Sequence, residues 1–435
     1  MSWLPVPPDH YFSINNIPFG IISTPSNTTP RPAVAIGEHV LDLHAFADSA
    51  NGFSQLPDFA QSEVFVSERT LNRFASLGRP IHRLVREYLQ EVLSIDTPYP
   101  GLLRDNPEAQ KACLLNSVED DVRMHLPMDI GDYSDFYAGK NHAFNVGVLF
   151  RGRENALQPN YEHLPVGYHG RASSVVVSGT RVPRPRGQVI KSGDGEKVPA
   201  FVESGKLDFE LEIAAFVGRG SDLGSCVGVD EAGEYLFGMV IMNDWSARDI
   251  QAWEYVPLGP FTSKSFATSI SPWVVLMDAL EPLRTRPLER GTKVPLLPYL
   301  QESNSESVYD IPLTTFLANQ KKKHIAHSGT HKISQTSSSN LLFSFSQMLA
   351  HHTITGCPLQ TGDLVGSGTI SGIDTQSMGS LLEMTQNGTR KVLLGDSGES
   401  RGFLEDGDVV VLAGGCGKAG VGFGECVGEI LPAGK

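Results

Sequence analysis

A short run near the middle of the chain alternates apolar and acidic residues without a break. Between residues 207 and 213, apolar residues occupy the odd positions and Asp208, Glu210 and Glu212 occupy the even ones. This period of two predicts a strand with three carboxylates on one face. Like charges so close repel one another, so the run is either a solvated strand face or a site for a cation. Acidic residues are uncommon in strands and no Lys or Arg is interleaved, so we favour a hard divalent cation held by oxygen ligands.

Length and composition indicate a globular protein of two or three domains. The chain has 435 residues, of which 40% are hydrophobic and 19% are charged, and it contains 44 Gly and 28 Pro. So many Gly and Pro residues predict a protein rich in strands and turns. The formal net charge of −14 argues against nucleic acid as a partner. No apolar run approaches the ~20 residues of a membrane span, so we expect no membrane partner either.

The cysteines predict a reducing compartment. Their number is odd and no two form a CxxC pair, which favours free thiols in the cytoplasm. The first residues also lack the pattern of a signal peptide. The cysteines are Cys113, Cys226, Cys357, Cys416 and Cys426.

The order of patterns along the chain predicts an N-terminal domain over residues 1–118 and a chemistry-bearing domain over 119–435. Short apolar runs at 18–22 and 33–37, broken by Pro and Gly, indicate strands of a small barrel or sandwich. A helix is expected to begin at Pro80, because the apolar residues that follow keep the i, i+3, i+4 spacing.

Asp135 and His142 begin the second domain's set of polar residues. They are seven residues apart, and on a single helix they would lie on one face, two turns apart. Each also has an ordinary interpretation. Asp135 could be a carboxylate at a helix start, and His142 a satisfied polar contact.

A second polar cluster follows a predicted buried strand over 235–242. Asp244 lies where this strand ends, and Ser246 is a candidate N-cap for the next helix. On that helix Arg248, Gln251 and Tyr255 share one face. Together with Lys264, these residues form a dense set of distinct polar types among tryptophans, which indicates a buried site.

Other stretches have weaker signals. Glu383 is a lone acid in an apolar segment that we expect to be a strand, and a buried acid needs a partner such as His142. The arginines of 150–187 could bind an anionic substrate or form a solvated loop face. The glycine-rich segments 366–372 and 415–420 fit close-packed turns rather than nucleotide sites. The lysine run 321–323 fits a solvated edge or loop.

Several long motifs resemble the fumarylacetoacetate hydrolase family. The resemblance covers nearly the whole chain and is strongest over about 129–275, whereas 187–199 and 283–340 depart from it in loop length. It implies a mainly β (α+β) fold, with a small N-terminal SH3-like barrel and a mixed β-roll catalytic domain, assembled as a homodimer. The motifs are 135–137 with His142, 164–174, 242–251, 253–261 and 366–372.

The resemblance also implies an activity. It is the hydrolysis of a carbon–carbon bond in fumarylacetoacetate, a small diketo-dicarboxylate, to fumarate and acetoacetate, the last step of tyrosine and phenylalanine breakdown. The implied cofactor is Ca²⁺ or Mg²⁺. The metal carboxylates would be Asp135, Glu210, Glu212 and Asp244, with Lys264 and Thr268 close to the ion. Asp208 has no counterpart in that set.

The remaining roles are implied in the same way. His142 would be the general base, paired with Glu383. Cleavage of a carbon–carbon bond by water also needs an oxyanion site, and by their chemistry Arg248, Gln251 and Lys264 can stabilise the oxyanion. The implied substrate contacts are Tyr137, Arg151, Tyr168, Gln251, Tyr255 and Thr369.

Two alternatives stay open. Acylpyruvate hydrolases, 2-oxo acid decarboxylases and diene-dioate isomerases of the same superfamily share the carboxylate site, so the metal ligands do not discriminate among them. A non-catalytic Ca²⁺-binding β module would explain the acidic run. It would not explain a histidine paired with an acid beside that run.

Overall fold

The computed structural model describes residues 1–56, 59, 62–193, 196–319, 330–395, 398–415 and 419–434. The lysine run 321–323 and Cys416 lie outside the described residues, as does the middle of the predicted turn 415–420. In the described part of the chain, no helix combines the length and the apolarity that crossing a bilayer requires.

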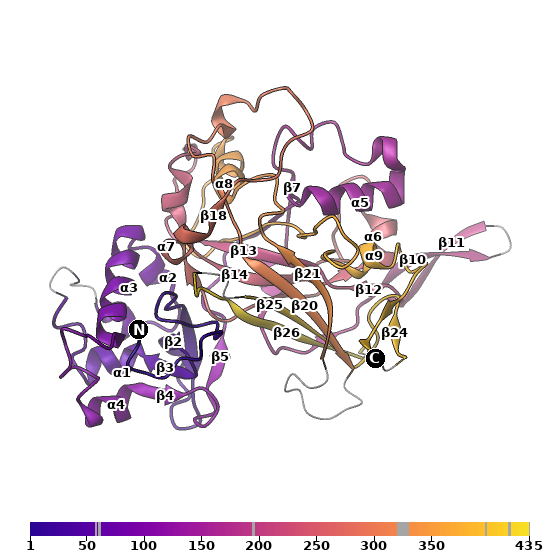
Figure 1. Cartoon of the computed structure of the whole chain (residues 1–435). Coiled ribbons are helices and arrows are strands. Elements are labelled where there is room, and N and C mark those ends of the chain that lie inside the picture. The colour runs from indigo at the N-terminus through magenta and orange to yellow at the C-terminus, as the bar shows by residue number, and fades with distance from the viewer. Residues whose placement is uncertain are drawn as a thin grey trace.

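The N-terminal part forms an antiparallel sheet with the strand order β4-β3-β2-β1-β5, covered by helices (Figure 1, indigo to violet). The strands expected at 18–22 and 33–37 and the helix expected from Pro80 are confirmed. The strands are β1 (Phe19–Ser23), β2 (Arg31–Ile36), β3 (His39–Asp42), β4 (Leu114–Asn116) and β5 (Arg123–His125). The helices are α1 (Leu43–Asp48), α2 (Asn72–Ala75), α3 (Arg79–Leu93) and α4 (Pro107–Cys113).

A mixed sheet in the middle of the molecule has the order β7-β6-β22-β13-β14-β16-β8, with β17 also paired to β14. Pairing is parallel between β6 and β22 and between β8 and β16, and antiparallel elsewhere. The strands are β6 (Tyr133–Phe136), β7 (Gly167–His169), β8 (Val175–Val177), β13 (Leu211–Val217), β14 (Leu236–Asp244), β16 (Thr268–Ile270), β17 (Val275–Leu276) and β22 (Leu364–Gly366).

A second sheet has the order β21-β20-β25-β26-β9. Its strands are β9 (Val182–Pro183), β20 (Pro312–Asn319), β21 (Thr330–Ser337), β25 (Asp408–Gly414) and β26 (Gly424–Leu431). A hairpin of β10 (Arg186–Gly193) and β11 (Glu196–Glu203) projects from the body of the molecule (Figure 1). Smaller pairs join β12 (Leu207–Asp208) to β15 (Ser246–Ala247), β18 (Arg284–Thr285) to β19 (Val308–Tyr309), and β23 (Val392–Leu393) to β24 (Ser400–Arg401).

The helices of this part are α5 (Lys140–Arg151), α6 (Arg248–Glu254), α7 (Met277–Leu280), α8 (Phe345–Thr353) and α9 (Leu381–Met384). In Figure 1, α5, α6 and α9 gather near the base of the projecting hairpin, whereas α8 lies at the opposite end of the central sheet.

Strand β14 explains why the central sheet is buried on both faces. Its successive side chains point to opposite faces. Val240 and Met242 pack in one core with the N-terminal helices and strands. Met239 and Ile241 pack in a second core with residues of the other sheet. The central sheet is therefore sandwiched between two layers, and the predicted mainly β architecture is confirmed.

The alternating acidic run differs from its prediction in two ways. It is not one unbroken strand, because β12 ends at Asp208 and β13 begins at Leu211. It is also not a solvated face, because Asp208, Glu210 and Glu212 are 0%, 5% and 0% exposed. The run crosses from one strand pair to another inside the protein, and the interpretation as a solvated face is wrong.

Three local predictions are also corrected. Asp135 lies on β6 and His142 on α5, so they do not share a helix. Ser246 is in β15, and α6 begins at Arg248 without a side-chain cap. Glu383 lies in the short helix α9 rather than in a strand, because Ser380 caps this turn by accepting the Glu383 N–H.

Candidate active site

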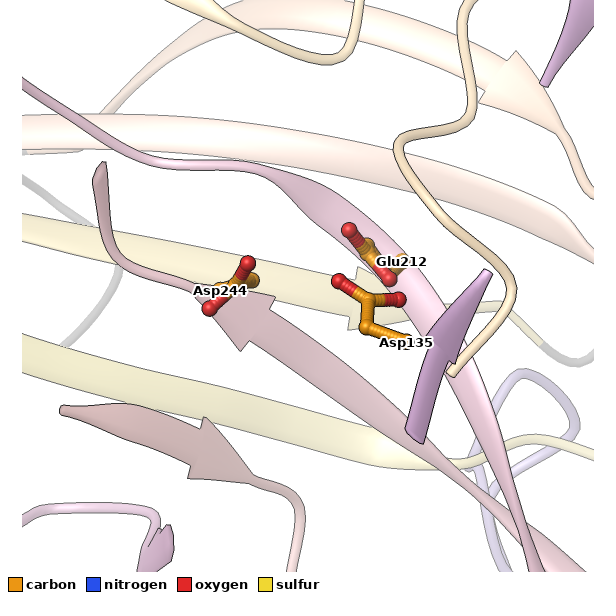
Figure 2. Close-up of side chains that lie close together, drawn as sticks. All are labelled: Asp135, Glu212 and Asp244. Atoms are coloured by element: carbon orange, nitrogen blue, oxygen red, sulfur yellow. The ribbon is translucent and has the colours of Figure 1, made fainter. Parts of the chain in front are cut away.

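Three buried carboxylates converge from neighbouring strands of the central sheet. Asp135 comes from β6, Glu212 from β13 and Asp244 from the end of β14. Each offers an oxygen, and these three oxygens lie within 4.8 Å of one another. Figure 2 shows the carboxyl groups of Asp135 and Glu212 side by side, with Asp244 facing them from the end of its strand. The arrangement could hold a metal ion.

A glycine makes this convergence possible. Gly366 on β22 is paired with Asp135 on one side and with Ala214 of β13 on the other. A Cβ at position 366 would lie 2.5 Å from Asp135 Oδ1 and 2.6 Å from Met242 Cε. Only glycine therefore leaves room for the Asp135 carboxylate over this strand.

Hydrogen bonds orient the outer oxygens of the cluster. The Tyr168 hydroxyl lies 2.7 Å from Asp244 Oδ2 and 3.1 Å from Asp135 Oδ2, so it can donate to either one. Thr268 Oγ1 donates to Asp244 Oδ1 over 3.2 Å. The Gly368 N–H donates to Glu212 Oε2 over 2.9 Å.

Two inner oxygens of the cluster lack such donors. Asp135 Oδ1 and Glu212 Oε1 are buried and have no hydrogen-bond partner among the described residues. Burial, together with the neighbouring carboxylates, raises the pKa of Asp135 and of Glu212 well above the ordinary range. Buried acceptors that consist only of carboxylate oxygens fit a hard divalent cation, which would supply the missing positive charge.

Glu210 is bound differently from the other acids of the run. Lys264 Nζ donates to Glu210 Oε2 and, over 2.5 Å, to Asp244 Oδ2. Arg248 Nη1 lies 2.7 Å from Glu210 Oε1. Burial raises the pKa of Glu210, but the charges of Lys264 and Arg248 outweigh burial and lower this pKa to about 2. Glu210 is thus ionised and already paired, and Lys264 links it to the cluster.

The predicted contact between His142 and Glu383 is present. His142 Nδ1 lies 2.6 Å from Glu383 Oε2, and both side chains are buried. A carboxylate accepts, so Nδ1 carries the proton and Nε2 offers its lone pair. Nε2 lies 3.8 Å from Glu210 Oε1.

Three further residues hold Glu383, and the sequence analysis missed them. Asn145 Nδ2 donates to Oε1 over 2.9 Å, while Ser371 Oγ and Ser380 Oγ each donate to Oε2 over 2.8 Å. Burial raises the pKa of Glu383, but His142 and these donors outweigh burial, and the net pKa is lowered. The i, i+3 spacing of His142 and Asn145 on α5 was a signal that could have found one of them.

The predicted substrate contacts surround this region unevenly. The Tyr137 ring packs edge-on against His142, with centroids 5.5 Å apart. Gln251 accepts from Arg248 Nη1 over 3.2 Å, and Thr369 is buried in the loop after β22. Tyr255 is 39% exposed.

Arg151 lies at the end of α5. It donates to the backbone carbonyls of Asn155 and Ala156, so its guanidinium is directed along its own chain rather than into the cluster.

The surface also has a separate cavity of about 490 Å³ beside β12. Its Lys206 donates to Asn387 Oδ1 over 2.8 Å and lies over the Phe403 ring. None of the predicted site residues lines this cavity.

Comparison with known proteins gives a consistent result over the whole chain. Residues 133–430 match the family model described as fumarylacetoacetate (FAA) hydrolase C-terminal, and residues 15–127 match fumarylacetoacetase N-terminal. The chain is 59% identical to a fumarylacetoacetase of Aspergillus fumigatus, with 99% of this chain and 98% of the relative covered. It is 46% identical to the Rattus norvegicus fumarylacetoacetase, with 100% and 99% covered.

Among solved structures, a fumarylacetoacetate hydrolase of Exiguobacterium antarcticum is similar in fold. Its TM-score is 0.52 and its identity 16%, over 96% of this chain and 99% of that one. The family models and the full-length relatives together carry the assignment. The chain therefore belongs to the fumarylacetoacetate hydrolase family.

Proposed function

We propose that this chain is an enzyme that hydrolyses fumarylacetoacetate to fumarate and acetoacetate, the closing step of tyrosine and phenylalanine breakdown. One observation carries the proposal. A histidine bonded to a buried acid has its other ring nitrogen 3.8 Å from Glu210, which Lys264 links to the buried carboxylate cluster. The full-length relatives named fumarylacetoacetase support the choice of substrate.

The cofactor in this proposal is Ca²⁺ or Mg²⁺. Asp135, Glu212 and Asp244 would hold the ion, and their unpartnered, buried oxygens support this. Glu210, which Lys264 links to Asp244, would complete the set. A bound divalent cation would act as a Lewis acid that polarises the oxygens of a diketone.

His142 is the general base in this mechanism. Its Nδ1–H is committed to Glu383, so Nε2 accepts a proton from water, and the hydroxide attacks a ketone carbon. The carbon–carbon bond then breaks, and its electron pair stays with the acetoacetate fragment. The proton held on Nε2 returns to that fragment, so one water is consumed and His142 is regenerated.

Arg248 and Lys264 are the groups that stabilise the negative charge formed on the attacked carbonyl, with Gln251 beside them. Arg248 Nη2 is buried and has no hydrogen-bond partner among the described residues, which supports a donor reserved for a ligand. Lys264 keeps its positive charge because the nearby carboxylates of Asp244 and Glu210 outweigh burial and raise its pKa.

The substrate contacts remain those of the family resemblance. Tyr137 packs against His142 and Tyr168 bonds the carboxylates, which supports their role, and Thr369 is buried in the loop after β22. Arg151 would have to leave the carbonyls at the end of α5 to reach a substrate carboxylate. Tyr255 is partly exposed, and its ring lies near that of Phe150 on α5.

The finer points of architecture are also proposals. We propose two domains, over residues 1–118 and 119–435. The connection between them extends over residues 118–132, because β5 still pairs with β1 of the N-terminal sheet. The N-terminal antiparallel sheet would be the SH3-like barrel, and the two remaining sheets the β-roll. A cytoplasmic location is supported by the free cysteines among the described residues.

The proposed homodimer would use the projecting hairpin and the loop after α6. Both segments expose large apolar side chains, and Trp253 Nε1 on α6 donates to Gln188 of β10. Patches of this kind mark interfaces. The exposed residues are Val198, Phe201, Trp253, Val256, Leu258 and Phe261. Light scattering on the Leu258→Asp variant tests this proposal, which expects a monomer.

The deciding experiment follows the diketone absorbance of fumarylacetoacetate with purified protein, before and after chelation. The proposal expects the band to disappear, the loss to stop on chelation, and the activity to return with Mg²⁺ or Ca²⁺. A stable band despite bound metal would reject this substrate. Acylpyruvates and 2-oxo acids would then be tested, and failure with all of them would favour a non-catalytic Ca²⁺-binding module.

A further inference from the structure

Asp208 is the acid of the alternating run whose carboxylate accepts hydrogen bonds from protein N–H groups at all of its acceptor positions. Its side chain is 0% exposed. Oδ1 accepts from the N–H groups of Phe209 over 2.9 Å and Leu381 over 2.8 Å. Oδ2 accepts from the Leu382 N–H and from Arg248 Nε, both over 2.9 Å. Four donors fill the four acceptor positions of a carboxylate, so Asp208 is not free to bind a metal.

The groups that Asp208 binds belong to two different parts of the site. Arg248 begins α6, and its Nη2 is buried without a partner. Leu381 and Leu382 begin α9, and the next residue is Glu383, which holds His142. One carboxylate therefore joins the proposed oxyanion group to the turn that carries the partner of the proposed base.

We propose that Asp208 is a positioning residue for the hydrolytic reaction, and that it fixes Arg248 and the α9 turn of Glu383 relative to each other. The proposal rests on the function proposed above for Arg248 and Glu383. Its physical basis is the directionality of hydrogen bonds. Guanidinium Nε and two successive backbone N–H groups can be satisfied by one carboxylate only in a narrow set of orientations. The orientation of Arg248 Nη2 toward a ligand follows from the same constraint.

Neutralising the charge of Arg248 does not by itself require Asp208. Glu210 Oε1 already lies 2.7 Å from Arg248 Nη1. Asp208 adds interactions that Glu210 does not make, namely the hydrogen bond from Arg248 Nε and the hydrogen bonds from the backbone of α9. We therefore expect loss of the Asp208 carboxylate to change the orientation of Arg248 and α9 more than it changes the electrostatic stabilisation of the Arg248 charge.

The chain offers a matched control. Asp408 and Arg401 form a second buried pair, with Oδ1 and Oδ2 each 2.9 Å from the guanidinium. Asp408 is 0% exposed and Arg401 5%. Among the described residues, no hydrogen bond or ion pair joins either of them to a proposed site residue. Asp408→Asn thus removes a comparable buried charge away from the site.

The test compares Asp208→Asn with Asp408→Asn. An amide in place of the carboxylate turns an N–H group toward two of the four donors, whichever way it is oriented. For Asp208→Asn we expect kcat to fall about 10–100-fold with KM and Mg²⁺ affinity little changed. For Asp408→Asn we expect a lower melting temperature with kcat of the folded protein unchanged. A kcat for Asp208→Asn within about twofold of wild type would overturn the proposal.

A double-mutant cycle separates positioning from general damage. If Asp208 acts through Arg248, the Asp208→Asn/Arg248→Lys variant loses less than the product of the two single losses. Multiplicative losses would overturn the proposal. If Asp208→Asn does not fold, Asp208→Glu is tested instead, because it keeps the charge but shifts it by one methylene. A wild-type kcat for Asp208→Glu would also overturn the proposal. Wild-type protein that fails to turn over fumarylacetoacetate refutes the proposed function, which is a distinct outcome.

Discussion

His142 donates its Nδ1–H to Glu383 Oε2 over 2.6 Å, although the two residues are 241 positions apart in the chain. The bond fixes the tautomer and the direction of the imidazole, and three other donors fix Glu383 in turn. The pair is therefore a rigid unit whose one free acceptor, Nε2, faces the carboxylates.

The first prediction concerns this pair. His142→Ala and Glu383→Gln should lower kcat about 10²–10⁴-fold, because the proton acceptor is removed or no longer oriented. Mg²⁺ affinity should change little, since neither side chain is in the cluster of Asp135, Glu212 and Asp244. Steady-state kinetics and calorimetric titration measure the two quantities. His125→Ala, which breaks a histidine contact to Ser23 in the N-terminal sheet, is the control. Loss of metal affinity as large as the loss of kcat would contradict this assignment.

The second prediction is that metal binding releases protons. Burial and mutual repulsion raise the pKa of Asp135 and of Glu212 well above ordinary values, so without an ion these carboxyls retain protons at a pH where exposed acids are ionised. A cation must displace those protons, and apparent Mg²⁺ affinity should therefore rise with pH above the ordinary carboxyl range.

Calorimetry at one pH in two buffers of different ionisation enthalpy checks this second prediction. The observed heat should differ between the buffers in proportion to the protons released. Glu212→Gln, which removes one ligand, should abolish the difference together with the binding. Equal heats for the wild type in both buffers would show that the cluster is already ionised.

The third prediction assigns Tyr168 a measurable part in holding the ion. Its hydroxyl lies within hydrogen-bond distance of both Asp135 Oδ2 and Asp244 Oδ2. Tyr168→Phe should weaken Mg²⁺ binding about tenfold, even without substrate, because the two carboxylates lose the group that orients them. Tyr161→Phe is a matched control, since that buried hydroxyl donates to the Tyr137 carbonyl instead. An unchanged affinity would leave Tyr168 with a substrate role alone.

The sequence allowed some of this site to be predicted because parts of it are local patterns. Alternation placed acids on a strand that enters a core, and apolar spacing placed α3. Motifs long enough to be specific then indicated which acids act together. The same alternation misled about Asp208, because the chain leaves β12 after that residue and Phe209 and Glu210 lie between strands.

The contacts that could not be predicted are those that depend on where the sheets bring distant segments. Asn145 and Glu383 are 238 positions apart, and Asp208 and Leu382 are 174 apart. No periodicity within either segment predicts that the two segments will be in contact. Single buried polar residues such as Ser371 and Ser380 also have no pattern of their own, and only a satisfied acceptor reveals their role.

The last prediction concerns stability in acid and a histidine outside the site. His82 on α3 is 1% exposed, and its Nε2 donates to the carbonyls of Phe74 and Ala75, each 3.0 Å away. Burial lowers its pKa from 6.5 to about 4, although the two carbonyl contacts oppose the shift. The folded protein thus keeps His82 neutral, whereas the unfolded chain takes up a proton below its ordinary pKa.

The direction in which pH changes the stability follows from proton uptake by the unfolded state. Between pH 6.5 and about 4 the unfolded state binds the proton and the folded state does not, so stability falls as pH falls through this window. The contribution of His82 to that loss is about 3 kcal/mol. His82→Gln retains a donor for the carbonyls but cannot titrate. Its urea-unfolding midpoint should therefore fall less steeply between pH 7 and pH 4.5 than that of wild type, whatever its midpoint at neutral pH. His44→Gln, on a partly exposed residue of α1, is the control substitution. Parallel slopes for His82→Gln and wild type would mean that His82 takes up its proton without unfolding.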